Sequence, residues 1–159
     1  MPEDSVFKAL LILDAWEVGN SCSEFGSTGA DIDAVQLFQC PQQDFTQCQS
    51  IAFFNDTRAL VGAQECANNY QDPDAALGEV DGGFIALQGG FVAGEFGSAL
   101  TLKSGMVLRV HEYGAVYGGG DDPYSVFLMT NLDCLDSEDI VNCSLYLGEG
   151  NGLGDFIVP

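Results

Sequence analysis

The segment ALTLKSGMVLRVHEY, residues 99–113, contains the clearest local signal for the fold. Apolar and polar side chains alternate on both sides of Ser104-Gly105, and alternation with a period of two is typical of β-strands that bury one face. Gly105 supplies the positive φ that a tight hairpin turn requires. The segment therefore predicts two antiparallel strands joined by a short turn.

Short β-rich runs of similar character recur along the chain, separated by clusters of Gly, Asp, Asn, Pro and Ser. They are VFKALLILDAWEV (6–18), DAVQLFQ (33–39), SIAFFN (50–55), FIALQ (84–88), YSVFLMT (124–130), CSLYLG (143–148) and DFIVP (155–159). The first run is apolar on both faces, which favours a central buried strand over a helix. Two Gly-rich stretches, GGFIALQGGFVAGEFG (82–97) and GEGNGLGD (148–155), are interpreted as turns. The chain has 159 residues without a visible repeat or linker, so we expect one all-β domain over 1–159, a sandwich or a barrel.

The charge balance is strongly acidic. The sequence has 24 acidic residues and only four cations, Lys8, Arg58, Lys103 and Arg109, which gives a net charge of −20. Nucleic acid is excluded as a partner because its phosphates would be repelled. Self-repulsion of this size destabilises a compact state unless salt screens it or bound cations neutralise it. Two interpretations stay open: an acidic surface that only confers solubility, and a surface that requires cations.

The sequence has six cysteines, an even number, and none of them forms a C-x-x-C pair. Only one histidine is present to complete a zinc site, so disulfides are the favoured interpretation. The cysteines are Cys22, Cys40, Cys48, Cys66, Cys134 and Cys143. Two short loops, 40–48 and 134–143, could each close locally and leave Cys22 with Cys66. This is one of about 15 pairings that six cysteines allow. Persistent disulfides predict an oxidising compartment and hence a secreted protein, extracellular or at the cell surface.

Targeting signals agree with that location. No charged and apolar leader precedes MPEDSVFK, so we expect any signal peptide to have been removed. No apolar run reaches the roughly 20 residues of a membrane-spanning helix. The sequons at Asn55 (Asn-Asp-Thr) and Asn142 (Asn-Cys-Ser) permit N-glycosylation.

Part of the chain resembles a known pattern. DPDAALGEVDGGFIALQGGFVAGEFGSALTLKSGMVLRVHEY (72–113) resembles bacterial cell-surface and secreted proteins in which D-P-x-x-A-L-G-x-x-D-G precedes a strand ending in Gly and an L-T-L strand. GADIDAVQL (29–37), DDPYSVFLMT (121–130) and LYLGEGNGLGDFIV (145–158) look like further parts of it, so the resemblance covers most of the chain. Such domains look like galactose-binding-like jelly rolls, a fold of many carbohydrate-binding and adhesive modules that often hold a structural Ca²⁺. The six cysteines depart from the pattern, so the resemblance implies a disulfide-stapled jelly-roll-like β-sandwich but no particular ligand.

Five carboxylates are candidate ligands of a structural Ca²⁺, because this ion takes six to eight oxygens from carboxylates and loop carbonyls. They are Asp31, Asp33, Asp72, Asp74 and Asp81. Asp31 and Asp33 are expected on one strand face, and the order of an EF-hand loop is absent. The alternative is that these residues cap turns, as Asp commonly does.

The sequence contains no strong catalytic motif. His111 is the single histidine and is predicted on the same strand face as Arg109, without a G-x-S-x-G motif, which favours a structural role. A pair of carboxylates at glycosidase spacing is expected by chance among 24 acids. No catalytic residue is therefore predicted. Sugar contacts would need aromatic faces, and the candidates are Trp16, Tyr113, Tyr117 and Tyr124; Tyr117 and Tyr124 are preferred because they flank a Gly-rich loop.

Three functions follow as hypotheses. The first is a non-catalytic extracellular structural or adhesive module, the self-assembling subunit of a surface assembly or filament. An apolar C-terminal segment, residues 156–159, could pair with a neighbouring sheet edge, or could be the last strand of its own sandwich. The second is a Ca²⁺-assisted carbohydrate-binding module. The third is a carboxylate-dependent hydrolase.

Overall fold

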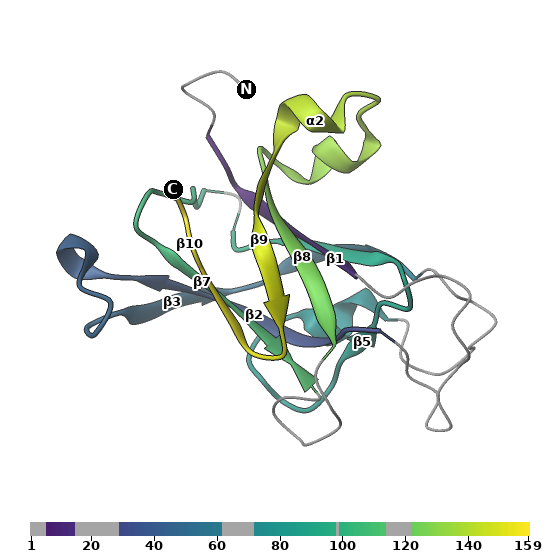
Figure 1. The fold of residues 1–159 in the computed structure, drawn as a ribbon, viewed down its shortest axis with the longest axis horizontal. Coiled ribbons are helices and arrows are strands. Elements are labelled where there is room, and N and C mark those ends of the chain that lie inside the picture. Colours follow the sequence, from purple (N-terminus) through teal and green to yellow (C-terminus); the bar gives the residue numbers. More distant parts are fainter. Residues whose placement is uncertain (1–5, 15–28, 62–71, 98, 114–121) are drawn as a thin grey trace.

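The computed structural model describes residues 6–14, 29–61, 72–97, 99–113 and 122–159. They form an antiparallel β-sandwich of two five-stranded sheets, which confirms the predicted all-β class (Figure 1). Successive strands pass repeatedly from one sheet to the other, as in a jelly roll. The predictions made for Trp16, Cys22, Cys66 and Tyr117 lie outside the described residues.

The first sheet has the strand order β4-β6-β1-β8-β9. Its strands are β1 (Ala9–Asp14), β4 (Asp56–Leu60), β6 (Phe91–Glu95), β8 (Pro123–Met129) and β9 (Ser144–Asn151). β1 lies between β6 and β8, and Leu11 is opposite Ala93 on one side and Phe127 on the other. The run that is apolar on both faces is thus a central strand, as predicted.

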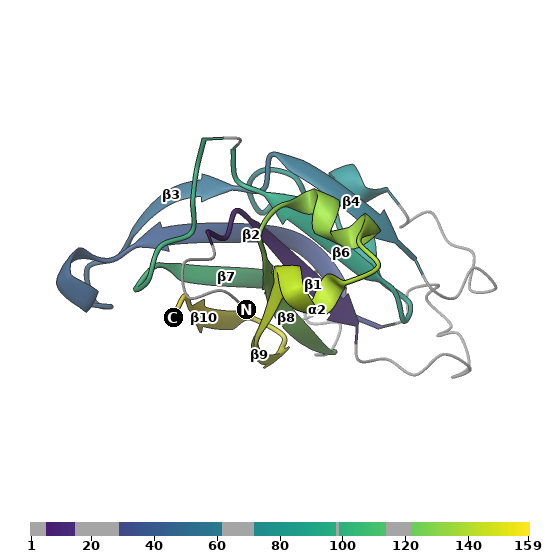
Figure 2. The same ribbon diagram turned by 90° about the horizontal axis from the view of Figure 1, so that it is seen from above.

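The second sheet has the order β10-β7-β2-β3, and β5 pairs with the start of β2. Its strands are β2 (Asp31–Gln39), β3 (Gln49–Phe53), β5 (Ile85–Ala86), β7 (Val107–Glu112) and β10 (Gly154–Ile157). The β2–β3 hairpin reaches well beyond the ends of β7 and β10 in both views (Figures 1 and 2).

The remaining elements are short helices: η1 (Pro41–Gln43), η3 (Pro73–Ala76), η4 (Leu132–Asp136) and α2 (Ile140–Cys143). Within the described part of the chain, no helix has the length and apolar character needed to cross a bilayer.

The main core fills the space between the sheets. Alternate residues of the facing strands are fully or almost fully buried there, including Leu10, Ile12, Val35, Leu37, Leu108, Val110, Val126 and Leu128. The C-terminal segment belongs to this core, because Phe156 and Val158 are buried and the Val158 N–H donates to the Met106 carbonyl. The last strand therefore lies in its own sandwich, the second of the two predicted alternatives.

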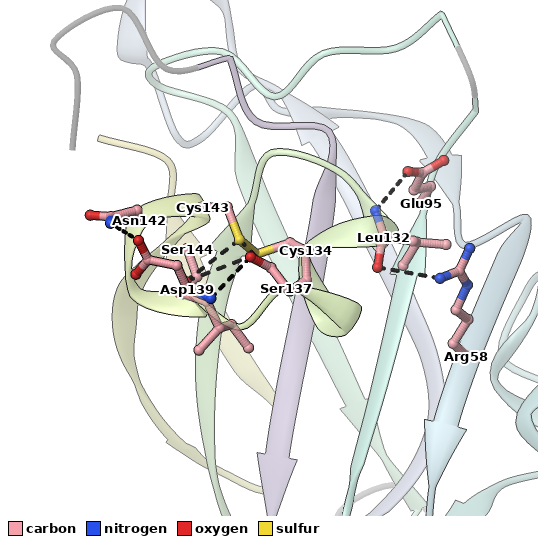
Figure 3. Close-up of a disulfide and its surroundings, with 10 residues drawn as sticks. Arg58, Glu95, Leu132, Cys134, Ser137, Asp139, Asn142, Cys143 and Ser144 are labelled. Carbon is pink, nitrogen blue, oxygen red and sulfur yellow. Dashed lines mark hydrogen bonds between the residues drawn. A yellow bond between two sulfur atoms is a disulfide. The ribbon is translucent and has the colours of Figure 1, made fainter.

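A second apolar cluster covers part of the outer face of the first sheet. The insertion 131–143 folds over Ala9, Leu11 and Ala93 and contributes Leu132 and the Cys134–Cys143 disulfide. Figure 3 shows the insertion tied to the sheet at one end, where the Leu132 N–H donates to Glu95 and the Leu132 carbonyl accepts from Arg58. The insertion explains why β1 is apolar on both faces.

Two of the predicted disulfides are confirmed, Cys40–Cys48 and Cys134–Cys143. The turn at Gly105 is also confirmed, since its φ is +86° and the Met106 N–H donates to the Lys103 carbonyl. The strand expected before it is wrong: within 99–103 only a single bridge forms, between Leu102 and Phe7.

The interpretation of the Gly-rich stretches as turns is wrong in part. GGFVAGEFG contains β6, and Gly94 in this strand lies flat against the Phe54 ring, which a β-carbon would approach to 2.5 Å. GEGNGLGD contains the end of β9 and the start of β10, and only its centre is a turn. Gly94 and Gly150 admit large rings within strands, whereas Gly89 and Gly152 adopt the positive φ of the turns.

Candidate functional site

The outer face of the second sheet contains a hollow of about 410 Å³. β2, β7 and β10 form its floor, and the loop closed by the Cys40–Cys48 disulfide forms one wall. Its lining residues are Phe38, Phe45, Thr46, Cys48, Val107, Arg109, Asp155 and Ile157. A concave site with apolar walls and a few convergent polar groups is the usual form of a ligand site.

An ion pair lies in this hollow. Arg109 Nε and Nη2 donate to the two carboxylate oxygens of Asp155 at 2.7 and 2.8 Å, and the guanidinium lies 5.0 Å from the centre of the Phe38 ring. The hydrogen bond from Arg109 lowers the pKa of Asp155, and the same bond raises the pKa of Arg109. This two-bonded Arg109–Asp155 pair, called the fork below, is electrically neutral and offers hydrogen-bond donors and acceptors side by side.

His111 lies beside this pair on the same face of β7, as its alternation with Arg109 predicts. Its Nε2 is 3.0 Å from Gln36 Oε1, and Gln36 Nε2 in turn donates to Ser50 Oγ at 2.7 Å. Burial, and then the charge of Arg109, lower the pKa of His111. The imidazole is therefore neutral at pH 7 and serves a polar network across three strands.

The β2–β3 hairpin is almost free of charge. Residues 34–55 contain one ionisable carboxylate, Asp44, and no cation, in a chain with 24 acids. Asp44 is turned to its own loop, where its carboxylate accepts from the Thr46 N–H and hydroxyl. We call residues 36–52 of this hairpin the arm; residues 36–38 still pair with β7, and the part from 39 to 49 reaches beyond it. Apart from the Asp44 carboxylate, the exposed side chains of the arm are glutamine amides, hydroxyls and apolar groups such as Phe45 and Ile51, so little charge repulsion opposes its approach to another acidic surface.

Comparison of the chain with protein-family models, curated proteins and solved structures gives no match. The resemblance to galactose-binding-like domains therefore stays a prediction. The assignment of the fold as a β-sandwich depends only on the two observed sheets.

The five candidate metal ligands come from three segments: Asp31 and Asp33 lie in β2, Asp72 and Asp74 lie at the start of η3, and Asp81 lies in the loop before β5. Asp33 is buried at a register shift of β2 and accepts from the N–H groups of Asp81 and Gly82, and its burial raises its pKa. Asp72 accepts from the Asp74 N–H, and Asp81 accepts from the Gly83 N–H. Among the described residues, no three His, Cys, Asp or Glu side chains converge on a possible metal position. These contacts are the turn and capping roles predicted as the alternative; calcium itself stays a prediction.

The prediction that Tyr124 contacts a ligand is wrong, because this residue lies in the core. Its side chain is 0% exposed, its hydroxyl donates to the Gly152 carbonyl at 2.7 Å, and its ring packs on Gly150 and Gly154. A ring in this position is not available to stack on a sugar. Tyr113 packs against Phe84, with ring centres 4.4 Å apart.

Both sequons lie on the surface. Asn55 is exposed in the short connection between β3 and β4, and its backbone N–H donates to the Glu95 carbonyl. Asn142 is exposed in α2, and its amide donates to Asp139. Accessibility therefore agrees with the predicted glycosylation at both positions but does not test it.

The sequence analysis predicted neither the hollow nor the arm. Phe38, Phe45, Arg109 and Asp155 are distant in the sequence, and only the pairing of β2, β7 and β10 brings them together. The arm could have been found, because a charge-poor stretch from 34 to 55 stands out in so acidic a chain.

Proposed function

We propose that this chain is a non-catalytic extracellular structural or adhesive module that makes its contacts through the arm. The observation that carries the proposal is the distribution of charge: a chain of net charge −20 projects one hairpin with a single carboxylate beyond the rest of the sandwich. Contact surfaces are typically depleted in charged residues at their centre and enriched in aromatic ones.

The extracellular part of the proposal is supported by the two described disulfides, because such bonds persist in oxidising compartments. One of them closes the loop at the tip of the arm. A covalent staple restricts the loop before contact, which lowers the entropy that binding must offset.

Protein-coated beads test this proposal. We expect beads coated with the chain to be retained on surfaces coated with the same chain or with extracellular glycans. Phe45→Asp should reduce retention because it places a charge on the arm at a side chain that is 50% exposed. Leu153→Asp, at an exposed position in the β9–β10 turn, adds the same charge elsewhere and should retain adhesion. Failure of the unmodified chain to adhere to any such surface would contradict the proposal.

A carbohydrate-binding module is a second candidate, and the hollow favours it. Phe45 offers an exposed ring, and the Arg109–Asp155 fork offers a donor and an acceptor for neighbouring hydroxyls. The fork is neutral, so the ligand would be an uncharged sugar. A calcium ion that assists binding would have to draw its ligands from separate carboxylates, because no three of the described ones converge.

A glycan array distinguishes the second candidate. Binding should appear for the unmodified chain and should be lost on Phe45→Ala. Tyr146→Ala, which removes an exposed ring from β9 on the other sheet, is the matched control and should bind normally. An array without signal would remove this candidate and leave adhesion between protein surfaces.

A further inference from the structure

We infer that two copies of this chain pair through the free edges of β3, antiparallel and across a two-fold axis, so that their second sheets become one continuous sheet. This inference rests on the proposed role of the arm as a contact surface and names its partner as a second copy.

The edge of β3 is open. β3 ends the order β10-β7-β2-β3 and is hydrogen-bonded to β2 alone among the described strands. Its first three residues, Gln49, Ser50 and Ile51, are exposed. Every second backbone N–H and C=O of an edge strand points away from its neighbour and can pair with another chain.

Three other edge strands carry charges that oppose such pairing, and a fifth, β5, is a buried strand of only two residues. β4 contains Asp56 and Arg58, β9 contains Glu149, and β10 is short and contains Asp155. Charged side chains and short strands are the usual protection of an edge against pairing. β3, with the sequence QSIAF, has neither a charge nor a proline. Among the five edge strands of the described sheets it is the one that is both uncharged and exposed, and so it is left open to a strand from another molecule.

The electrostatics favour a second copy over a cationic partner. A cationic partner would gain most on the acidic surfaces, and the arm offers it almost no charge. Two copies, in contrast, repel each other everywhere except where both are uncharged. The outer part of the arm projects beyond the sandwich in both views, so pairing through β3 brings uncharged segments of the two copies together (Figure 2). A two-fold contact also needs only one self-complementary surface.

Space for side chains exists at this edge. A hollow of about 270 Å³ is lined by Gln39, Pro41, Gln47, Gln49 and Ile51, all uncharged. Ile51 lies at the register shift of the β2–β3 pair and is 42% exposed. An apolar side chain from the second copy can enter this hollow, and glutamine amides at its rim can donate and accept across the axis.

Sedimentation velocity tests the pairing. We expect the unmodified chain to dimerise at about 0.5 M NaCl and to dissociate at about 20 mM, because salt screens the acidic bodies. Ile51→Glu should weaken dimerisation by about tenfold or more, since two-fold pairing brings the two new carboxylates together. Leu153→Glu adds the same charge at an exposed turn and should leave the dimer nearly unchanged. Should Ile51→Glu lower the melting temperature, the isosteric Gln49→Glu serves as the second edge variant.

A chain that stays monomeric in high salt at every accessible concentration would overturn the inference. Equal weakening by Ile51→Glu and Leu153→Glu would overturn it as well, because the effect would then be one of net charge. Adhesion of coated beads in either case would leave the proposed function standing and place its partner outside this chain.

Discussion

Among single residues, Arg109 is one of four cations in the chain and is committed to Asp155 inside the hollow. Arg58, on the other sheet, is committed to Asp133 and Asp136 of the insertion. Both arginines therefore join segments distant in sequence rather than neutralise the acidic surface. Exposed ion pairs contribute about 0–1 kcal/mol, and the bidentate Arg109–Asp155 pair has the better geometry of the two.

The pH dependence of the Arg109–Asp155 pair can be predicted. The pKa of Asp155 is lowered from 3.8 by its hydrogen bond with Arg109, so its stabilising effect is present above pH 3.8 and is lost as the pH falls through the lower, folded-state value. Asp155→Asn should therefore lower the melting temperature at pH 6, and the difference from the parent chain should shrink as the pH falls below 3.8. Thermal melts of both proteins over this range measure the difference, and a constant difference at all pH values would contradict the assignment.

The buried hydroxyl of Tyr124 gives a second prediction. Tyr124→Phe leaves the Gly152 carbonyl without its 2.7 Å donor and should cost about 1–2 kcal/mol of unfolding free energy. Tyr146→Phe, at an exposed position, should cost nothing measurable. Urea unfolding of the two variants provides the comparison. Equal stability of Tyr124→Phe and the parent chain would mean that water replaces the lost donor.

At the level of elements, glycines in strands make room for rings. Gly94→Ala should destabilise the fold by about 1–3 kcal/mol, because the new methyl would meet the Phe54 ring in the core. Gly148→Ala in β9 is the matched control, since its β-carbon would lie 3.5 Å from Phe156, an ordinary contact. Chemical denaturation should separate the two variants, and similar stabilities would show that the Phe54 ring shifts at no cost.

The same physics decides which strands could be predicted. β1, β7 and β8 were predictable because their buried faces are made of large apolar residues. β4 was missed because DTRAL is an edge strand with a polar composition, and β6 was missed because its glycine looked like a turn. Residues 99–103 alternate correctly yet form only one bridge. Alternation of apolar and polar residues indicates that one face of a segment is buried, but it does not indicate whether a neighbouring strand is present to pair with it.

The candidate site was less accessible to sequence analysis than the fold. The face shared by His111 and Arg109 follows from the period of a strand, and the structure confirms it. The partner of Arg109 does not follow, because Asp155 is one acid among 24 and only the register of β10 with β7 selects it. Tyr124 was misassigned because its position beside a Gly-rich loop suggested a surface ring, although the alternation in β8 turns it to the core.

For the whole molecule, net charge predicts a salt response. The melting temperature should rise between about 10 mM and 0.5 M NaCl, because screening reduces the self-repulsion of the compact state. The carbohydrate-binding alternative adds a calcium response: a few millimolar CaCl₂ should raise the melting temperature beyond NaCl of equal ionic strength. Differential scanning calorimetry measures both. A melting temperature that does not depend on NaCl would mean that the carboxylates are locally compensated.

The central position of β1 also governs when the domain can form. An N-terminal strand that pairs with residues 91–95 on one side and 124–129 on the other has no partners until most of the chain exists. Folding that depends on contacts this distant in sequence is slow. The first sheet can therefore close on both sides of β1 only after residue 129 has been synthesised. The Cys134–Cys143 disulfide lies in the segment that follows the last strand partner of β1, so it can close only after that partner has been synthesised.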